Sequence, residues 1–442
     1  MKRGFNFSGR GLFMTLAALF ALVMAFPGTA HAYLDPGTGS LIFSAVISLA
    51  VTFLFMFKSF FHRVIGLFYR LKGSAAPAGN KEAIVFYSEG RAYWNTFKPV
   101  LEALEAAGEP AVYLSSSQDD PGLDHSFKHI KAQYIGSGNR AFAALNMLEA
   151  AVCVMTTPGL DVLQIRRSPG VPHYAHLVHT HTDAALYKLH SFDYFDSVLC
   201  SGPHQMRSLR HLESLRGTKP KMLLATGCPY MDVLADELEA AGSQAAEKNG
   251  PPRIMLAPTW GANGLLSRFG LDLLLPLAKA GYALTIRPHP QSRKVEQKLL
   301  AALAKGLAGY ANVSWDEDLS PLPAMLASQV LVSDVSGIIF DYAFILERPV
   351  VTVNQEVDTR GTEAADIPWP AWELAVLPEL GASIEAGNIL SLPEIIKSLP
   401  GPEEFSARMG KLRAESLYNF RQSGQVAAKQ ILELRDLSST GK

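Results

Sequence analysis

The chain has 442 residues, with 40 Lys and Arg against 41 Asp and Glu, and a formal net charge of −1. Its apolar fraction of 48% is enough to bury a core, which excludes a disordered chain. The three cysteines show no paired spacing, which excludes a disulfide scaffold and argues against a zinc site built on cysteine pairs.

The charges are divided unevenly along the chain. Residues 1–80 carry seven basic and one acidic side chain, a net charge of +6. Residues 81–442 carry 33 basic and 40 acidic side chains, a net charge of −7. A basic beginning before an acidic body is typical of a membrane protein. The body has no run rich in Lys and Arg, so we predict no nucleic-acid partner.

Two apolar stretches near the start predict contact with a membrane. Residues 1–32 have the pattern of a signal sequence or of a first membrane helix, with a basic start, an apolar stretch and a small-x-small end. Residues 33–80 are predicted to hold a transmembrane helix and a juxtamembrane linker, because the charge-free stretch 36–57 approaches the roughly 20 residues that a spanning helix needs. Basic residues follow this stretch, and by the positive-inside rule they belong in the cytoplasm.

Two topologies remain open for this segment. The signal is cleaved and one helix crosses the membrane, or it is retained and two helices form a hairpin. Both place the remaining chain on the same side. We therefore predict a location at the cell inner (cytoplasmic) membrane, with the catalytic domains facing the cytoplasm.

From residue 81 onward, short apolar runs alternate with helical patterns, which indicates βαβ units and parallel sheets. Strands are predicted at 83–87, 111–114, 151–155, 173–178, 197–200 and 222–225, and then at 253–257, 282–286, 330–332 and 350–353. Helices are predicted at 93–107, 141–150, 271–280, 321–328 and 337–345, and within the tail 402–434. The polar segment 236–252 ends in Gly-Pro-Pro and marks a domain boundary. Two doubly wound domains with a cleft between them account for this pattern.

Ligands of open α/β sheets bind beyond the carboxyl ends of the strands, so the polar residues that follow predicted strands are the candidates. Ser333, Asp334, Ser336 and Gly337 lie between a predicted strand and a predicted helix. Exposed backbone N–H groups at such a helix start bind phosphate. The alternative is an ordinary Ser or Asp helix cap, which is common at this kind of turn.

Arg287 and His289 follow another predicted strand and are flanked by prolines. In an extended backbone, residues two apart share one face. A cation and an imidazole side by side suit a diphosphate or a leaving phosphate. Thr259 follows a third strand end and is a candidate donor to the same ligand, with Trp260 beside it as a wall or as a packing residue.

Four histidines gather in residues 173–181: His173, His176, His179 and His181. In a strand, three of them face one way and His176 faces the other. No Cys or Glu completes a metal set, so we predict no metal site. A general base at the strand end is the favoured interpretation, because neutral imidazole accepts a proton from an alcohol near neutral pH.

Three motifs in order carry a resemblance to a known family: Ala-Pro-Thr-Trp at 257–260, Arg-Pro-His-Pro at 287–290, and Ser-Asp-Val-Ser-Gly at 333–337. Together they resemble the CDP-glycerol glycerophosphotransferase family of teichoic-acid synthesis. The resemblance implies an α/β, GT-B-like fold of two Rossmann-like domains around a cleft, here preceded by an N-terminal membrane segment. It implies an N-terminal (acceptor) domain over 81–240, a C-terminal (nucleotide donor) domain over 250–400, and a C-terminal helix and tail over 401–442.

The resemblance also implies roles for single residues. His179 matches the histidine proposed as the base of the family, and His289 matches a second histidine implied to contact the donor diphosphate. Binding of the donor phosphates and nucleotide is then expected at Arg287, Ser333, Asp334, Ser336, Gly337 and Thr259. Positions 178, 180, 335 and 337 depart from the family motifs, which indicates a divergent member.

We therefore predict a membrane-anchored transferase that moves an alditol phosphate from CDP-glycerol, or a similar CDP-alditol, to a lipid-linked or glycan hydroxyl and releases CMP. No tightly bound cofactor is expected, since fixed positive groups take the place of a metal. Two alternatives stay open: a nucleotide-sugar glycosyltransferase or epimerase on the same fold, and a non-catalytic, membrane-tethered nucleotide-binding protein.

Overall fold

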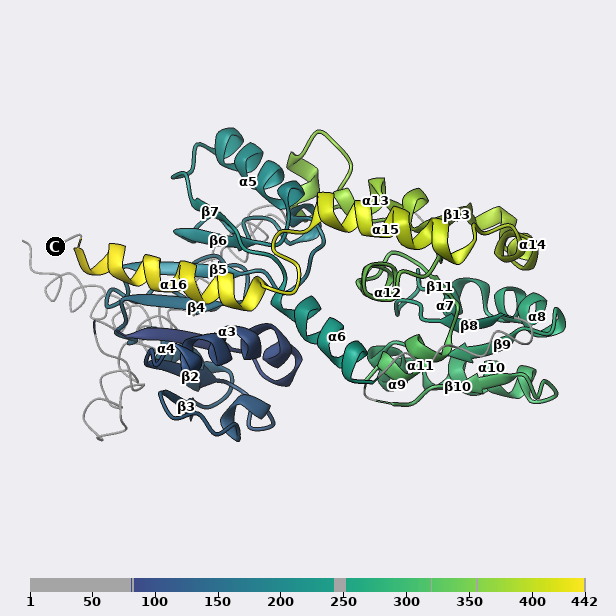
Figure 1. Ribbon diagram of the computed structural model, residues 1–442, viewed down its shortest axis with the longest axis horizontal. Helices are drawn as coiled ribbons and strands as arrows, with labels where there is room; N and C mark the ends of the chain where they lie inside the picture. The colour runs from purple at the N-terminus through teal and green to yellow at the C-terminus, as the bar shows by residue number, and fades with distance from the viewer. Residues whose placement is uncertain (1–80, 82, 242–251, 319, 355–356, 441–442) are drawn as a thin grey trace, which may run out of the picture. The chain divides into compact units, whose positions relative to one another are not determined.

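Two parallel β-sheets organise the described part of the chain (Figure 1). The computed structural model describes residues 81–440, apart from 82, 242–251, 319 and 355–356. The first sheet has seven strands in the order β3-β2-β1-β4-β5-β6-β7, and the second has six in the order β10-β9-β8-β11-β12-β13. Neighbouring strands run parallel in both sheets.

The strands of the first sheet are β1 (Ile84–Ser88), β2 (Ala111–Ser115), β3 (Ile130–Tyr134), β4 (Val152–Met155), β5 (His173–Leu177), β6 (Ser197–Cys200) and β7 (Met222–Ala225). Those of the second sheet are β8 (Arg253–Leu256), β9 (Ala283–Ile286), β10 (Val313–Trp315), β11 (Val330–Ser333), β12 (Val350–Asn354) and β13 (Gly381–Glu385).

The α-helices up to the second sheet are α3 (Trp94–Ala106), α4 (Asn139–Leu145), α5 (Pro203–Arg216) and α6 (Pro229–Ala240). Those that follow are α7 (Leu265–Phe269), α8 (Leu271–Lys279), α9 (Pro290–Val295), α10 (Gln297–Leu307), α11 (Leu322–Ala327), α12 (Ile338–Leu346), α13 (Trp372–Ala375), α14 (Leu392–Lys397), α15 (Pro402–Ser416) and α16 (Ser423–Thr440). Short 3-10 turns are η1 (Arg91–Tyr93), η2 (Pro121–Leu123), η3 (Ala184–Leu186), η4 (Glu363–Asp366), η5 (Leu377–Leu380) and η6 (Ala386–Ser391).

The central strand β1 shows why the first sheet is covered on both faces. All five of its residues are buried. Ile84 and Phe86 pack with the side chains of α3 and α16, and Val85 and Tyr87 pack on the other face with those of α4. A continuous apolar run is what a parallel strand with two covered faces requires.

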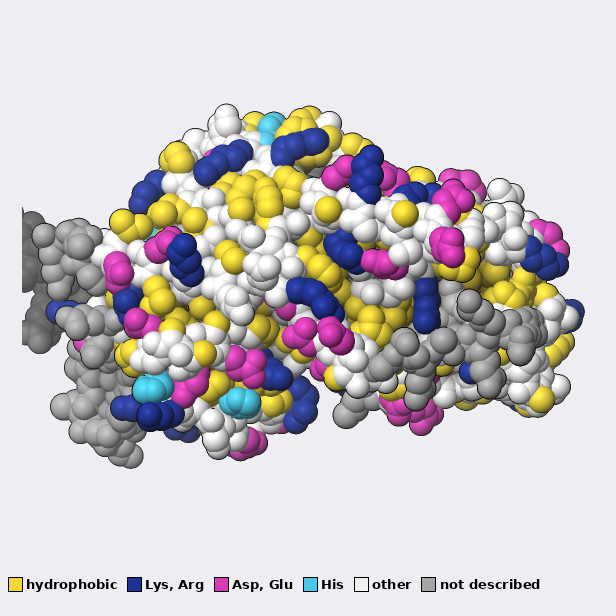
Figure 2. Space-filling view, viewed as in Figure 1, with side chains coloured by type: hydrophobic (Ala, Val, Ile, Leu, Met, Phe, Trp, Pro, Cys, Tyr) yellow, Lys and Arg dark blue, Asp and Glu magenta, His cyan; other side chains and the backbone are white. Residues whose placement is uncertain are grey.

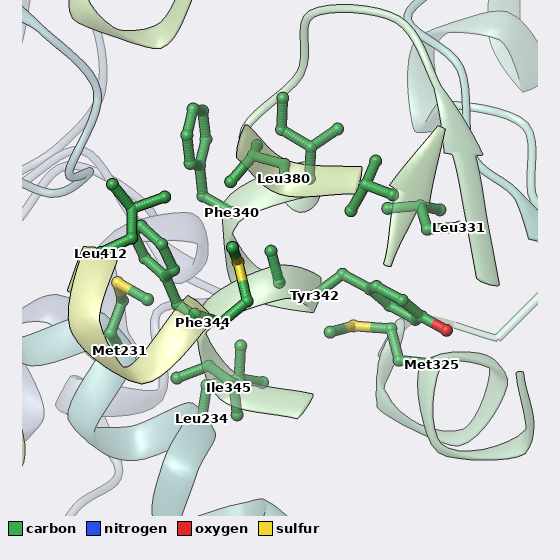
Figure 3. Close-up of a cluster of buried hydrophobic side chains, with 14 of the residues drawn as sticks. Met231, Leu234, Met325, Leu331, Phe340, Tyr342, Phe344, Ile345, Leu380 and Leu412 are labelled. Atoms are coloured by element: carbon green, nitrogen blue, oxygen red, sulfur yellow. The ribbon is translucent and has the colours of Figure 1, made fainter. Parts of the chain in front are cut away.

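The second sheet has the same two-sided cover. One of its cores contains side chains from α6, α12 and α15, and Figure 3 shows Met231 of α6, Phe344 of α12 and Leu412 of α15 meeting there. The other contains side chains from α7, α8 and α10. The chain therefore builds the second sheet's cover partly from α6, which follows the last strand of the first sheet.

The C-terminal helix α16 returns to the first sheet and lies beside α3 (Figure 1). Its Gly424 makes this close approach possible, because a Cβ there would meet the Cβ of Pro99 at 2.5 Å. The last α-helix of the described chain therefore packs on its first one.

The alternation of strands and helices predicted from the sequence is confirmed for the inner strands of both sheets. Three strands were not predicted, namely β3, β10 and β13, and each forms an edge of its sheet. The predicted domain boundaries of 81–240, 250–400 and 401–442, and the predicted cleft, stay predictions.

The fold-class prediction needs one correction, because it combined the two Rossmann-like domains with a preceding N-terminal membrane segment. None of the helices in the described ranges has the length and apolar character that a membrane crossing needs. The segments predicted as signal sequence (1–32) and as transmembrane helix and linker (33–80) lie outside the described residues. The fold class of the described chain is therefore the two-sheet α/β architecture alone, and the predicted location stays a prediction.

On the face shown in Figure 2, basic and acidic side chains are interspersed rather than gathered by sign. Several ion pairs among the described residues are exposed or half-exposed, such as that between Arg421 and Glu239 at 2.8 Å. Exposed pairs of this kind contribute little to stability, typically below about 1 kcal/mol.

Candidate functional site

The first sheet has a switch point between β1 and β4. These strands are neighbours, although α3, β2, β3 and α4 separate them in the chain. Connections leave this point in opposite directions, and ligands of such sheets bind beyond the carboxyl ends of the strands there. Glu89 follows β1, Thr157 follows β4 and His179 follows β5.

His179 lies against two tyrosines at this edge. Its ring centre is 5.2 Å from that of Tyr93 and 6.2 Å from that of Tyr187, and both rings meet it edge-on. Its Nδ1 is buried and has no hydrogen-bond partner among the described residues. Burial lowers the pKa of His179 to about 4, because desolvation disfavours the imidazolium. The ring is therefore neutral, and able to accept a proton, throughout the physiological pH range.

The other histidines of the cluster do not share a face with His179, since β5 ends at Leu177. His176 is fully buried among Phe192, Phe195 and Tyr187, which lowers its pKa to about 3. His173 lies at the start of the strand, with Nε2 3.0 Å from the Ser197 hydroxyl.

His181 packs against a different part of the chain, the aromatic side chains Phe340 and Phe344 of α12. The four histidines are thus divided among separate environments. Within the residues that the structure describes, no group of three or more His, Cys, Asp or Glu is arranged to hold a metal ion.

The second sheet has its own switch point between β8 and β11. The predicted donor-binding residues all follow β8, β9 or β11, which are adjacent in the order β9-β8-β11. The structure therefore brings these residues to the carboxyl ends of three adjacent strands: Thr259, Arg287, His289, Ser333, Asp334, Ser336 and Gly337. His179 instead follows β5 and lies at the carboxyl ends of the strands of the first sheet.

Ser333, Asp334 and Thr259 are engaged in hydrogen bonds inside the protein. Ser333 is fully buried, and its hydroxyl donates to the carbonyl oxygen of Ala257 at 2.6 Å. Asp334 is 3% exposed and accepts hydrogen bonds from Thr259 N at 2.7 Å, Thr259 Oγ1 at 2.8 Å and Leu265 N at 3.3 Å. Ser333 and Asp334 fasten the loop that follows β8, and their direct contact with a donor phosphate stays a prediction.

Arg287 and His289 are held in fixed orientations at the end of β9. The guanidinium forms an ion pair with Asp316 at 2.5 Å, and both side chains are largely buried. The Nδ1 atom of His289 accepts from the backbone N–H of Gln291 at 3.1 Å, so in the neutral ring Nε2 carries the proton and is a donor. Partial burial lowers the pKa of His289, against the opposing effect of Asp334 and Glu296. Trp260 stacks on the ring, with centres 6.4 Å apart.

The start of α12 has no side-chain cap. Gly337 occupies the cap position and is exposed, and Ser336 beside it is partly buried. Neither Ser336 nor Asp334 therefore caps this helix with its side chain, so the alternative interpretation as an ordinary helix cap is wrong. An uncapped helix start leaves backbone N–H groups available to an anion. A cavity of about 270 Å³ lies next to it, lined by Val335, Asn354, Val357, Leu374 and Leu377.

Glu89, Tyr93, Thr157 and Tyr187 were not predicted as site residues. Glu89 and Thr157 lie two residues beyond the predicted strands 83–87 and 151–155, so their place near a strand end was a usable signal. Tyr93 and Tyr187 lie in short 3-10 turns or beside them, and no periodic pattern marks them.

A known family model matches much of the chain. The sequence profile described as CDP-Glycerol:Poly(glycerophosphate) glycerophosphotransferase matches residues 79–364. No curated protein matches the whole sequence significantly.

Solved structures of the wall teichoic acid polymerase TagF share the fold at low sequence identity. One superposes with a TM-score of 0.52 at 17% identity, covering 87% of this chain and 99% of TagF. A histidine-to-asparagine variant of TagF soaked with CDPG gives 0.53 at 16% identity, covering 86% and 98%. A histidine-to-alanine variant gives 0.54 at 17%, covering 87% and 99%. These likenesses support the GT-B-like fold of two parallel sheets.

Proposed function

We propose a reaction that uses the residues at the carboxyl ends of the strands in both sheets. The chain belongs to the CDP-glycerol:poly(glycerophosphate) glycerophosphotransferase family and is a transferase of that type. The protein transfers glycerol phosphate from CDP-glycerol, or a closely similar CDP-alditol, to a hydroxyl of a glycan or polyol acceptor and releases CMP. The acceptor lies at the carboxyl edge of the first sheet and the donor at that of the second.

His179 acts as the base in this proposal. It removes the proton from the acceptor hydroxyl, and the oxygen attacks the β-phosphorus of the donor. A new P–O bond forms, the bond between the β-phosphorus and the bridging oxygen breaks, and CMP leaves with that electron pair. An imidazole with a pKa of about 4 is a weak base in the free protein. A dianionic donor near the ring favours the imidazolium and raises that pKa.

The donor phosphates are stabilised by fixed hydrogen-bond donors and by one arginine at the second sheet. His289 offers its Nε2–H, since its Nδ1 is already occupied by the N–H of Gln291. Arg287 adds a permanent positive charge, and the uncapped start of α12 adds backbone N–H groups. Preorganised donors of this kind stabilise the charge that develops on a transferred phosphoryl group.

The single observation that carries the proposal is the environment of His179. A neutral imidazole with an unpartnered, buried Nδ1 lies at the switch point of the first sheet, between two tyrosines. Buried polar atoms without partners are rare in folded proteins, and at such an edge they are typical of a site that is completed by a ligand.

The test uses purified protein, CDP-glycerol and a short poly(glycerophosphate) primer, with CMP release and primer extension measured together. We expect His179→Ala to lower kcat by about 100- to 10,000-fold, which is the usual contribution of a general base. His125→Gln, an exposed histidine on the same domain, is the matched control and should keep full activity.

Two results would contradict the proposal. The first is full activity of His179→Ala, which removes the base. The second is a larger thermal shift with UDP- or CMP-sugars than with CDP-glycerol, because only the true donor strongly stabilises the folded protein.

A further inference from the structure

The loop that carries His179 runs from the end of β5 to the 3-10 turn η3, and α5 holds it from one side. Three consecutive carbonyl groups of the loop lie within hydrogen-bond distance of side chains of α5: Thr180, His181 and Thr182. Gln205 donates to the first at 3.2 Å and to the third at 2.7 Å, and His204 has its Nε2 2.7 Å from the second. Both side chains are buried, so α5 fixes the path of the loop just beyond His179.

The end of the same loop is attached to α13 by two hydrogen bonds. The backbone N–H of Asp183 donates to Oε2 of Glu373 at 3.0 Å, and the backbone N–H of Trp372 donates to Oδ2 of Asp183 at 3.1 Å. Both carboxyl side chains are 1% exposed, and hydrogen bonds are stronger in such a dry environment than in water. The Trp372 ring also stacks on that of His204, with centres 4.3 Å apart. The loop is thus joined to a segment 190 residues further along the chain.

The segment around α13 also forms one wall of the cavity beside the start of α12. Leu374 and Leu377 line this cavity, together with Val335 and Asn354 of the second half of the chain. Glu373 directly precedes Leu374, so one short segment both lines the cavity and holds the loop. The His179 loop is therefore linked to the nucleotide-donor side of the candidate site.

The His179 ring depends on its loop for its position. The ring touches Tyr93 and Tyr187 edge-on, and its Nδ1 has no hydrogen-bond partner among the described residues. A general base must stay within hydrogen-bond reach of the proton that it removes, and a displacement of about 1 Å can lower the rate about 100-fold. The bonds that fix the loop backbone are therefore expected to matter for the reaction.

We propose that Glu373 is a positioning residue for His179. It acts through Asp183, because the two hydrogen bonds between the loop and α13 hold the imidazole where it can take the proton of the attacking hydroxyl. The base is then in place only while its loop is attached to the segment that lines the donor-side cavity. This inference rests on the proposed function and adds to it a residue of the second half of the chain that places the base of the first.

The test measures the extension of a poly(glycerophosphate) primer by Glu373→Met, with CDP-glycerol as donor. The methionine side chain has a similar length, but its thioether is a far weaker acceptor than a carboxylate. We expect kcat to fall about 10- to 100-fold. The KM for CDP-glycerol and the number of CDP-binding sites per chain, measured by calorimetry, should stay as in the wild type. A variant that is only partly folded would instead lose CDP-binding sites in proportion to kcat.

Two further variants test the link itself. Glu373→Gln removes the charge but keeps an oxygen that accepts from the N–H of Asp183, so its kcat should stay within about threefold of the wild type. Asp183→Ala opens the link from its other end and should lower kcat as Glu373→Met does, which keeps the test decisive if Glu373→Met does not fold. Because both residues act through one link, the double variant should lose no more than about twofold beyond the larger single loss.

Tyr230→Phe is the matched control. It removes a hydrogen bond that also joins distant parts of the chain, from Tyr230 of α6 to Asp341 of α12 at 3.2 Å, rather than one to the His179 loop. Its kcat should equal that of the wild type even where its melting temperature is lower.

Every other outcome counts against the inference. Full kcat in Glu373→Met or in Asp183→Ala would overturn the role of Glu373 while the transferase reaction stands. A fall of kcat in Glu373→Gln or Tyr230→Phe as large as that in Glu373→Met, or a parallel loss of CDP-binding sites, would also overturn it. A wild-type protein that releases no CMP in the presence of the primer would instead overturn the proposed function, and this inference with it.

Discussion

Asp334 is the residue on which the loop after β8 depends. Its buried carboxylate accepts from two N–H groups and one hydroxyl, and these bonds fix Thr259 beside the candidate donor site. Burial raises the pKa of Asp334 and the three hydrogen bonds oppose that rise. Asp334 thus fixes the position of Thr259, and with it that of the adjacent Trp260, next to the candidate donor site.

Asp334→Asn tests this support at the scale of one residue. The amide keeps one oxygen acceptor but presents an NH₂ group to a second backbone donor, so at least one bond is lost. We expect the free energy of unfolding to fall by about 2 kcal/mol, in the range for hydrogen bonds to charged groups, and the KM for CDP-glycerol to rise several-fold. Urea unfolding and steady-state kinetics would measure the two effects. Asp236→Asn on α6, which is exposed, should change neither.

The sequence placed the candidate residues at strand ends, but it did not show which of them are free to bind. Ser333 and Asp334 looked like ligand contacts because they follow a strand. Their partners lie about 75 residues away along the chain, and only the folded sheet brings them together. Tyr93 and Tyr187 carry no such signal in the sequence, and only the folded structure places both rings against His179.

At the scale of elements, the three strands that were not predicted are edge strands, although the fourth edge strand, β7, was predicted at 222–225. An inner strand such as β1 is buried on both faces and reads as an apolar run. The edge strands β3, β10 and β13 have mostly half-buried or exposed side chains, and β10 has only three residues. Their patterns are short and mixed, so neither an apolar run nor a regular alternation marks them.

The packing of α16 on α3 gives a prediction at the same scale. Gly424→Ala places a methyl group where the Cβ would lie 2.5 Å from Pro99 Cβ and 2.9 Å from its carbonyl carbon. The backbone of α3 cannot yield easily, so we expect the free energy of unfolding to fall by about 1–3 kcal/mol. Thermal or urea unfolding would measure this change.

The matched control is Gly410→Ala in α15, where no heavy atom lies within 4 Å of the added Cβ. Alanine is the better helix former, so this variant should be more stable by about 0.5–1 kcal/mol. The opposite signs of two identical substitutions in neighbouring helices would identify close packing as the cause. A stabilised Gly424→Ala protein would contradict it.

At the scale of the whole molecule, buried charged and polar groups tie segments that are distant in the chain. Arg216 of α5 pairs with Asp193 at 3.0 Å, with Asp366 at 2.7 Å and with the buried Glu363. Tyr230 of α6 donates to Asp341 of α12 at 3.2 Å. These links join parts of the first half of the chain to parts of the second, and no local sequence pattern predicts them.

Asp183 and Glu373 form the link whose stability should depend most clearly on pH. The backbone N–H of Asp183 donates to Glu373 Oε2 at 3.0 Å, and that of Trp372 donates to Asp183 Oδ2 at 3.1 Å. Each carboxyl keeps one buried oxygen without a partner among the described residues. Burial, with a contribution from Asp183, raises the pKa of Glu373 from 4.5 to about 7.

The sign of the effect follows from proton binding. Between pH 4.5 and about 7 the folded protein holds a proton on Glu373 that the unfolded chain has lost, so this group makes the protein less stable as pH rises through that window. Glu373→Gln removes the titration, and its NH₂ group can donate to the free oxygen of Asp183. We expect the variant to match the wild type near pH 4.5 and to melt several degrees higher at pH 8, as measured by calorimetry. Glu379→Gln, an exposed neighbour, should show no such pH-dependent difference, and an equal gain at both pH values would mean that the ionisation of Glu373 is not what destabilises the link.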